Sequence, residues 1–441
     1  MNLHALLQKR LDAGKPVRAG LIGAGKFGSM FLAQVAKTPG LEVAVIADLD
    51  PDRARQACKA VGWDDALIAA TRFVESGADL IADPAVEVAI EATGHPAVGV
   101  EHALTAAREG KHIVMVNVEA DVLAGPLLAE ACRKAGVVYS MAYGDQPALI
   151  CEMVDWARSI GLEVVAAGKG TKYLPGYHAS TPDTVWDYYG LSPEDAKAGG
   201  MNPKMFNSFL DGTKSGIEMA AVANATGLGV PRGGLAFPPC SVDELAEVLK
   251  PKSAGGLLDD KGMVEVISSE RREGGTVERD LRWGVYTVFE ASSDYTARCF
   301  REYGLKTDSS GRFAAMYKPY HLIGLELGIS VLSVALRGEP TGTTRSFTGD
   351  VAAVAKRPLK AGELLDGEGG YCVWGRLTAA EDSIARGAVP IGLAQGITLT
   401  RDVAEGEVVC WRDVRAEEES AAYKLRQEMV ARFAPPAVAA K

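Results

Sequence analysis

The sequence predicts an α/β protein: a Rossmann-type doubly wound parallel sheet, then an α+β catalytic domain and a small β-rich module. Three observations lead to this fold class. A short apolar strand, residues 17–22, runs into the G-x-G-x-x-G loop Gly23–Gly28, and a helix follows. A second apolar strand, 41–47, ends in Asp48, twenty residues beyond Gly28. Further apolar strands alternate with helices, which is typical of a parallel sheet made of βαβ units.

The glycine loop is predicted to hold the pyrophosphate of a nicotinamide dinucleotide, NADPH or NADH. Gly23 allows the tight turn, Gly25 lets the backbone approach the phosphates, and Gly28 lets the helix pack closely on the strand. Lys26 and Phe27 complete the loop. Backbone N–H groups at the start of the helix would meet the anion.

Asp48 bears on which nicotinamide cofactor is used. A carboxylate at this position suits a free ribose 2′-hydroxyl and repels a 2′-phosphate, which favours NAD. Arg53 and Arg55 follow in the next helix and could reach a 2′-phosphate if Asp48 swung aside, or they could be solvated surface residues. The sequence therefore leaves the choice between NAD and NADP open.

Other predicted strands also end in polar residues, where an α/β sheet meets its ligands. The strand 86–90 runs into Thr93 and Gly94, and the strand 112–116 into Asn117. We expect these three residues to bind the cofactor. Glu119 is a catalytic candidate or a cap of the next helix, and Asp145, in a comparable loop after residues 137–140, is a substrate-binding candidate.

Composition limits the partners. The chain has 441 residues, a net charge of −10 and 47% hydrophobic residues, which argues against binding to nucleic acid or anionic membranes. Seven scattered cysteines without a C-x-x-C pair indicate a reducing compartment, and we expect a cytoplasmic protein. No apolar run reaches the roughly 20 residues of a membrane span, and no sequence-local metal motif appears. Small molecules and copies of the chain itself, as a homo-oligomer, are the expected partners.

We predict four segments along the chain. They are a nucleotide-binding domain (1–150), a catalytic, substrate and oligomerisation domain (151–348), a β-rich module (349–415), and a charged helix with a Pro/Ala tail (416–441). Within the second segment, a strand over 162–167 precedes Lys169, and one long helix runs from Asn202–Pro203 to Gly227. An apolar helix over 320–336 should pack on the nucleotide domain or at a subunit contact.

The long helix carries the predicted catalytic face. Asn207, Asp211, Lys214 and Glu218 are spaced by four, three and four residues, which places them on one face. This face is either catalytic or merely solvated. Gly212 and Gly216 would each cost roughly 1 kcal/mol in a helix relative to alanine, so we expect a ligand or another element pressed against them.

Lysines are the expected acid–base and anion-binding groups, because burial lowers an ammonium pKa toward neutrality. Lys214 is the first candidate for the proton donor, with Asp211 orienting it, and Lys204 is the second. Lys169, between two glycines, would bind a substrate phosphate or carboxylate unless it sits in an exposed turn. Asn207 and Glu218 are expected to contact the substrate.

Several longer motifs resemble those of one known family. They are GAGKFG, EATG, VMVNVEAD, YGDQPALICE, GKGTKY, STPDTVWD, NPKMFNSFLDGTKSGIE and DGEGGYCVWG. Across nearly the whole chain they resemble the reductoisomerase-like oxidoreductases, in which a homoserine-dehydrogenase-like region precedes a C-terminal SAF-type β module. Homoserine dehydrogenases place an Asp and a Lys beside the nicotinamide, and Asp211 and Lys214 resemble that pair at a narrower spacing of three.

The resemblance implies NADPH-dependent conversion of 1-deoxy-D-xylulose 5-phosphate to 2-C-methyl-D-erythritol 4-phosphate, a step of isoprenoid precursor synthesis. A phosphorylated substrate would meet Lys169, Lys172 and Lys204, and Mg²⁺ or Mn²⁺ would assist the rearrangement. Two alternatives stay open. One is plain hydride transfer on a hydroxy acid, sugar acid or polyol, without a metal. The other is a nucleotide-sensing protein whose SAF-like module binds a carbohydrate.

Overall fold

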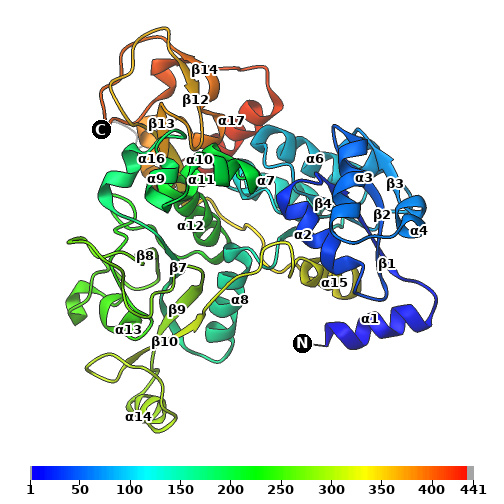
Figure 1. The fold of residues 1–441 in the computed structure, drawn as a ribbon. Helices are drawn as coiled ribbons and strands as arrows, with labels where there is room; N and C mark the ends of the chain where they lie inside the picture. The colour runs from blue at the N-terminus through cyan, green and yellow to red at the C-terminus, as the bar shows by residue number, and fades with distance from the viewer. Residues whose placement is uncertain (1, 435–441) are drawn as a thin grey trace. The chain divides into compact units, whose positions relative to one another are not determined.

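The computed structural model describes residues 2–434, which form two compact units (Figure 1). Unit 1 comprises Met1–Glu152 and His321–Arg345, and unit 2 comprises Met153–Tyr320 and Ser346–Lys441. The second segment of unit 1 therefore returns to the nucleotide-binding part of the chain. The predicted Pro/Ala tail lies outside the described residues.

Unit 1 is built on a six-stranded parallel sheet, which confirms the predicted fold class. The strand order is β3-β2-β1-β4-β5-β6, which is typical of dinucleotide-binding sheets and reverses direction between β1 and β4. The strands are β1 (Val17–Ile22), β2 (Leu41–Ala47), β3 (Arg72–Val74), β4 (Val88–Glu91), β5 (His112–Met115) and β6 (Tyr139–Met141). Ligands bind where the order reverses, at the carboxyl ends of the strands.

Helices connect these strands. They are α1 (Leu3–Asp12), α2 (Lys26–Val35), α3 (Pro51–Ala60), α4 (Asp65–Ala70), α5 (Gly77–Ala82), α6 (Pro96–Arg108) and α7 (Val118–Lys134), with α8 (Gln146–Ser159) crossing into unit 2. The predicted helix over 320–336 begins later, as α15 (Gly328–Arg337). Gly324 has φ +77°, which is incompatible with a right-handed helix there. Val331 of α15 joins Phe31 and Leu32 of α2 in the core of unit 1.

Unit 2 contains a second, mixed sheet, in the order β10-β9-β7-β8. Its strands are β7 (Glu163–Thr171), β8 (Met263–Ser268), β9 (Val285–Glu290) and β10 (Phe313–Lys318). β7 runs farther than the predicted 162–167, through two glycines that the sequence suggested were a turn. Both allow close strand contacts, since a Cβ on Gly168 or Gly170 would lie 1.7 Å from the Glu265 carbonyl oxygen or 2.0 Å from that of Leu281.

The predicted long helix over 203–226 is wrong, because the chain breaks it into two. α11 (Pro203–Leu210) ends at Asp211, and α12 (Thr213–Thr226) begins after Gly212, whose φ of +91° reverses the chain. Within unit 2, α12 contacts β7 and β8 as well as β11 and β13, so it is covered on opposite sides (Figure 1). This explains why nearly every residue of α12 is buried.

The β-rich segment of unit 2 forms two small antiparallel sheets, β11 with β13 and β12 with β14 and β15. Their strands are β11 (Gly349–Ala355), β12 (Leu364–Asp366), β13 (Val373–Ala379), β14 (Gln395–Leu399) and β15 (Val414–Arg415). We call residues 349–415 the C-terminal module. The other helices of unit 2 are α9 (Val185–Tyr189), α10 (Pro193–Ala198), α13 (Leu245–Val248), α14 (Asp294–Glu302), α16 (Ala380–Arg386) and α17 (Ala421–Phe433).

Candidate active site

The glycine loop of unit 1 has the geometry that its sequence predicts. Gly23 has φ +95°, and a Cβ there would lie 2.8 Å from the Ala92 carbonyl oxygen. A Cβ on Gly28 would lie 2.3 Å from the Gly23 carbonyl oxygen, so only glycine lets α2 start this close to β1. A Cβ on Gly25, in contrast, would meet no atom within 4 Å. Gly25 therefore lines open space in front of the helix.

The amino end of α2 is left without a cap. Gly25 occupies the N-cap position, no side chain accepts a hydrogen bond from the first turn, and that turn contains no acid. The five helices that follow, α3 to α7, are all capped by a side chain: Asp50, Asp64, Ser76, His95 and Asn117. Unsatisfied N–H groups at an open helix end favour an anion. The residues present therefore fit a dinucleotide pyrophosphate.

Asp48 lies next to this loop and is already engaged. Its carboxylate is buried, and Oδ2 accepts a hydrogen bond from the Ala24 N–H at 3.0 Å. Its Oδ1 accepts from the Asp50 N–H at 3.1 Å and from the Arg53 guanidinium at 2.6 Å. The Arg53 charge is thus committed to Asp48, while Arg55 pairs with Asp52.

The strand end after β4 lies beside the glycine loop, since Gly23 approaches Ala92. Thr93 donates to the Glu91 carboxylate from both its backbone N–H and its hydroxyl, and Glu91 is fully buried. Gly94 has φ +70°. After β5, the Asn117 side chain accepts from the Ala120 N–H at 3.0 Å and donates to the His95 carbonyl at 3.0 Å. Asn117 thus fixes the loop before α6 as well as capping α7.

The acidic candidates of unit 1 differ in burial. Glu119 lies in the first turn of α7 and is partly exposed. Asp145 is buried, and its Oδ1 accepts from the Gln146 N–H at 2.9 Å. Asp121, two residues after Glu119 on α7, is fully buried. Desolvation raises its pKa to about 6, although hydrogen bonds from Thr344 and Tyr139 act in the opposite direction.

In unit 2, β7 and α12 bring two predicted substrate-binding residues together. The Lys169 ammonium and the Glu218 carboxylate form a buried ion pair, with 5% and 2% of each residue exposed. Lys169 is therefore neither in an exposed turn nor at a strand end, because β7 continues past it. Lys214 lies one helical turn before Glu218 on α12, so the two side chains share a face.

The predicted face of four aligned residues does not exist, because the chain reverses at Gly212. Asn207 is buried on α11, where its Nδ2 donates to the carbonyls of Ser180 and Gly369 at 3.1 and 3.0 Å. The Asp211 carboxylate binds Lys356 at 2.7 Å and the Thr213 N–H at 2.9 Å. Asp211 lies at the end of α11, and Lys214 lies in the first turn of α12, after the break at Gly212.

Two lysines expected to bind a substrate phosphate already bind protein acceptors. The Lys204 ammonium donates to the Asp366 carbonyl, and Lys172 pairs with Glu270 at 2.8 Å. Lys169 likewise pairs with Glu218. All three lysines that were predicted to bind a substrate anion therefore contact acceptors of the protein itself. Among residues 2–434, no group of three or more His, Cys, Asp or Glu side chains is placed to hold a metal ion.

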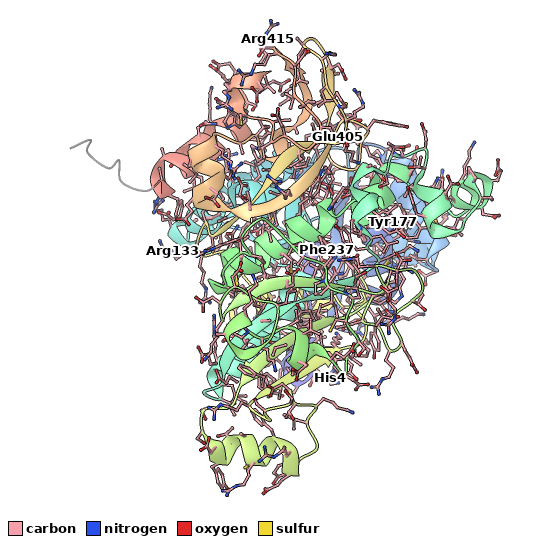
Figure 2. All side chains as sticks on the ribbon, turned by 90° about the vertical axis from the view of Figure 1, so that its left-hand side faces the viewer. His4, Arg133, Tyr177, Phe237, Glu405 and Arg415 are labelled. Carbon is pink, nitrogen blue, oxygen red and sulfur yellow. The ribbon has the colours of Figure 1, made fainter. Side chains whose placement is uncertain are left out.

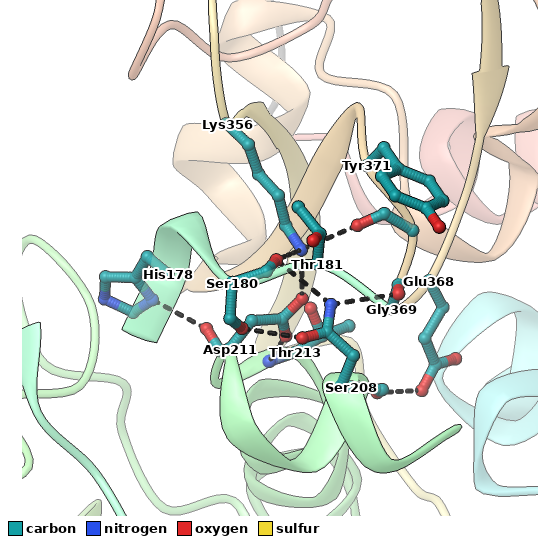
Figure 3. A network of polar contacts seen from close by, with 12 residues as sticks. His178, Ser180, Thr181, Ser208, Asp211, Thr213, Lys356, Glu368, Gly369 and Tyr371 are labelled. Atoms are coloured by element: carbon teal, nitrogen blue, oxygen red, sulfur yellow. Dashed lines mark hydrogen bonds and ion pairs between the residues drawn. The ribbon is translucent and has the colours of Figure 1, made fainter. Parts of the chain in front are cut away.

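Sequence reasoning missed a polar network around Asp211 (Figure 3). Lys356, from the C-terminal module, is buried. It forms an ion pair with Asp211 and donates to the carbonyls of Ser180 and Gly370 at 2.7 and 2.8 Å. His178 Nδ1 lies 2.6 Å from the Asp211 carbonyl oxygen. Lys356 lies far from Asp211 along the chain, so local sequence patterns could not predict their contact. The paired glycines of DGEGGY indicated a close contact in this region, and a Cβ on Gly369 would lie 2.0 Å from the Lys204 carbonyl oxygen.

The His178 ring joins this network to an aromatic cluster. Burial lowers the pKa of His178, so the neutral ring donates from Nδ1 to the carbonyl and accepts at Nε2 from the Tyr173 hydroxyl, 2.9 Å away. The ring stacks on Trp374, with centroids 3.8 Å apart, and Tyr173 stacks on Phe237 at 3.9 Å. His178 and Phe237 lie beside the start of α12, because a Cβ on Gly212 would contact both rings.

Phe237, labelled in Figure 2, is buried and has an unusual backbone conformation, with φ +49°. The Glu265 carboxylate accepts from the N–H groups of Ala236 and Phe237, and Arg272 donates to both of their carbonyls. Burial raises the pKa of Glu265 to about 7, although the hydrogen bonds that it accepts lower the pKa. Contacts from two sides therefore hold this left-handed residue in place, which is typical of strained residues at functional sites.

Two family descriptions match successive parts of the chain. Residues 17–143 match "Oxidoreductase family, NAD-binding Rossmann fold" (GFO/IDH/MocA), and residues 144–327 match "Oxidoreductase DRL, catalytic domain". A homoserine dehydrogenase of Neisseria gonorrhoeae is 31% identical over 112 residues. That match covers 23% of each protein, so the chain spans about a quarter of the length of this curated relative.

Solved structures of dehydrogenases are similar at low identity. A probable dehydrogenase from Thermotoga maritima is 16% identical, with a TM-score of 0.39 over 74% of this chain and 90% of the other. Levoglucosan dehydrogenase in complex with NADH and levoglucosan is 15% identical, with a TM-score of 0.32 over 69% and 66%. Biliverdin reductase from Synechocystis, with biliverdin and NADP⁺, is 18% identical, with a TM-score of 0.27 over 36% and 48%.

Residues 17–143 thus form a Rossmann domain of the GFO/IDH/MocA oxidoreductase type, and residues 144–327 resemble the DRL catalytic domain. These matches support the predicted oxidoreductase class and a nicotinamide cofactor. They do not identify a substrate, and they do not support the predicted reductoisomerase reaction in particular. Within residues 2–434, no helix has both the length and the apolar composition that crossing a bilayer requires.

Proposed function

We propose that this protein transfers a hydride between NADH and the carbonyl carbon of a small polar substrate, with NADH preferred over NADPH. The observation that carries the proposal is the uncapped end of α2 at Gly25, which contrasts with the side-chain caps of α3 to α7. The cofactor preference rests on Asp48. Its buried carboxylate would repel a 2′-phosphate, and it already binds the neighbouring Arg53 guanidinium.

Unit 2 supplies the acid–base groups in this proposal. As hydride reaches the carbonyl carbon, the carbonyl oxygen gains negative charge and takes a proton, and Lys214 is the donor. The neighbouring Lys169–Glu218 pair keeps a second cation and a carboxylate at fixed positions one turn along the same helix. The nicotinamide, when bound, supplies the hydride. The reverse reaction returns the proton to Lys214 and the hydride to the oxidised cofactor.

A second candidate is reductive isomerisation of 1-deoxy-D-xylulose 5-phosphate. The long motifs of the chain, through their resemblance to the reductoisomerase-like oxidoreductases, favour it. The contacts of Lys169, Lys172 and Lys204 favour plain hydride transfer, because a substrate phosphate would have to displace a protein acceptor from each lysine. Plain hydride transfer is therefore the preferred candidate.

A substrate panel separates these candidates. We would follow nucleotide absorbance with the purified protein, NADH or NADPH, and 1-deoxy-D-xylulose 5-phosphate, with and without Mg²⁺ or Mn²⁺. Parallel reactions would contain NAD⁺ or NADP⁺ with unphosphorylated hydroxy acids, sugar acids and polyols. Turnover in the second set alone supports plain hydride transfer. Oxidation of NADPH that yields 2-C-methyl-D-erythritol 4-phosphate would replace it with reductive isomerisation.

Lys214→Ala tests the acid–base role with whichever substrate turns over. We expect kcat to fall by two or more orders of magnitude, in line with the loss of a general acid, while the affinity for NADH stays native. Lys204→Ala is the companion variant, because the Lys204 ammonium binds a backbone carbonyl and should affect kcat little. A native kcat for Lys214→Ala would remove Lys214 from the mechanism.

A further inference from the structure

We propose that Lys356 of the C-terminal module is a positioning residue for the acid–base groups of α12, acting through the Asp211 carboxylate. The proposal rests on the proposed function, because it takes Lys214 on α12 as the proton donor. It assigns the C-terminal module a part in the reaction, since Lys356 contacts Asp211, and Asp211 contacts Thr213 in the first turn of α12 (Figure 3).

The Lys356 ammonium is fully used by the protein. Its three acceptors are the Asp211 carboxylate at 2.7 Å and the carbonyl oxygens of Ser180 and Gly370 at 2.7 and 2.8 Å. Two of the three N–H donors of the ammonium are thus taken by carbonyl oxygens, and the Asp211 carboxylate lies at ion-pair distance. Both side chains of the ion pair are buried, with 2% of Lys356 and none of Asp211 exposed. The surroundings of Lys356 therefore come from the protein, and its role is to hold Asp211.

Asp211 in turn fixes where α12 begins. Its Oδ1 accepts from the Thr213 N–H at 2.9 Å, and its carbonyl accepts from His178. The chain then reverses at Gly212, and Thr213 starts the helix. The Thr213 hydroxyl accepts from the Gly375 N–H at 2.8 Å, so β13 of the C-terminal module holds the same turn from another side. Lys214 is the next residue.

Charge makes this arrangement sensitive to the loss of either partner. Burial raises the pKa of Asp211, and the Lys356 ammonium opposes that change. Removing Lys356 leaves a carboxylate that is buried and uncompensated, which is strongly unfavourable, whereas replacing both charges is often tolerated. Other ionisable groups near Asp211 include His178, which binds its carbonyl, and Tyr189. Arg376 acts on His178, and Arg282 acts on Tyr189.

The test compares Lys356→Met, Asp211→Asn and the double variant, each as the full chain. We expect Lys356→Met to lower kcat at least tenfold at neutral pH, with unchanged NADH affinity because the glycine loop belongs to unit 1. Its kcat should recover as the pH is lowered, because a protonated Asp211 no longer buries a charge. The double variant should regain most of the native kcat. Lys360→Met is the control, since Lys360 is an exposed lysine of the same module.

Hydrogen exchange gives a readout that does not depend on the reaction. Amides in the first turn of α12 should lose protection in Lys356→Met and regain it in the double variant. Native kcat and native protection in Lys356→Met, or a double variant as impaired as the single one, would overturn the proposal. If Lys214→Ala keeps native turnover while the exchange pattern follows the prediction, the proposed role of Lys214 fails and the positioning of α12 by Lys356 stands.

Discussion

Two helices of this protein begin at a glycine that has no capping side chain, α2 in unit 1 and α12 in unit 2. In front of α2, a Cβ on Gly25 would meet nothing within 4 Å. The start of α12 is filled instead. Asp211 accepts the Thr213 N–H, and a Cβ on Gly216 would lie 3.2 Å from the Gly375 carbonyl oxygen. One end is open for an anion, and the other is closed by the protein's own acid and strand.

The difference shows that a glycine at the start of a helix predicts a ligand site only where the space in front of the first turn is open. Gly25 has φ −71°, which any residue can adopt, so glycine there serves to keep space free. Gly212 has φ +91°, so glycine there serves to turn the chain. The same residue type thus marks the proposed cofactor site in unit 1 and a structural break in unit 2.

Closing the open end should have the largest effect. Gly25→Asp would place a carboxylate where it can cap α2, and we expect NADH affinity to fall at least a hundredfold because the new charge competes with the pyrophosphate. The melting temperature should stay within a few degrees of native, since the backbone conformation suits a cap. Equilibrium titration of NADH by fluorescence measures the affinity, and thermal unfolding measures the melting temperature. Native NADH affinity in this variant would place the dinucleotide elsewhere.

Crowding the closed end should affect stability instead of nucleotide binding. Gly216→Val would push side-chain atoms against β13, and overpacking of this kind costs about 1–3 kcal/mol. Denaturant unfolding should show the loss in unit 2, and NADH affinity should be unchanged. Weakened NADH binding without a change in stability would contradict the division of roles between the two helix starts.

A change at Asp48 should have the smallest effect, on cofactor preference alone. Asp48→Ser removes the charge that opposes a 2′-phosphate and frees Arg53 to bind one, so the ratio of NADPH to NADH affinity should rise about tenfold, or roughly 1.4 kcal/mol. Titration with both nucleotides measures the ratio. Arg53→Ala is the matched control, because it leaves the carboxylate in place and should not favour NADPH.

The fold of unit 1 could be predicted because its signals are local. The strand 41–47 coincides with β2, and the loop Gly23–Gly28 and Asp48 lie where the spacing placed them. The break at Gly212 could not be predicted in the same way. Helical spacing favoured one continuous helix, and the contacts that stabilise the break come from Lys356 and Gly375, far along the chain.

The same reasoning applies to the site. Lys169 and Glu218 were both predicted from the sequence to bind the substrate. Their pairing depends on β7 continuing through Gly168 and Gly170, and these two glycines suggested a turn instead. Phe237 carried no signal at all, because its left-handed backbone depends on Glu265 and Arg272. Local sequence patterns cannot predict residues whose role depends on contacts with distant parts of the chain.

The covering of α12 on opposite sides also has a consequence for how the chain is made. β7 and β8 are synthesised by residue 268, but β11 and β13, which cover its other side, are complete only at Ala379. Until then, the apolar and small residues of α12 that β11 and β13 later cover lack that cover. Nascent chains that pause in this interval would expose a surface prone to aggregation. The small sheet of β11 and β13 thus completes the cover of α12 only after most of the chain has been synthesised.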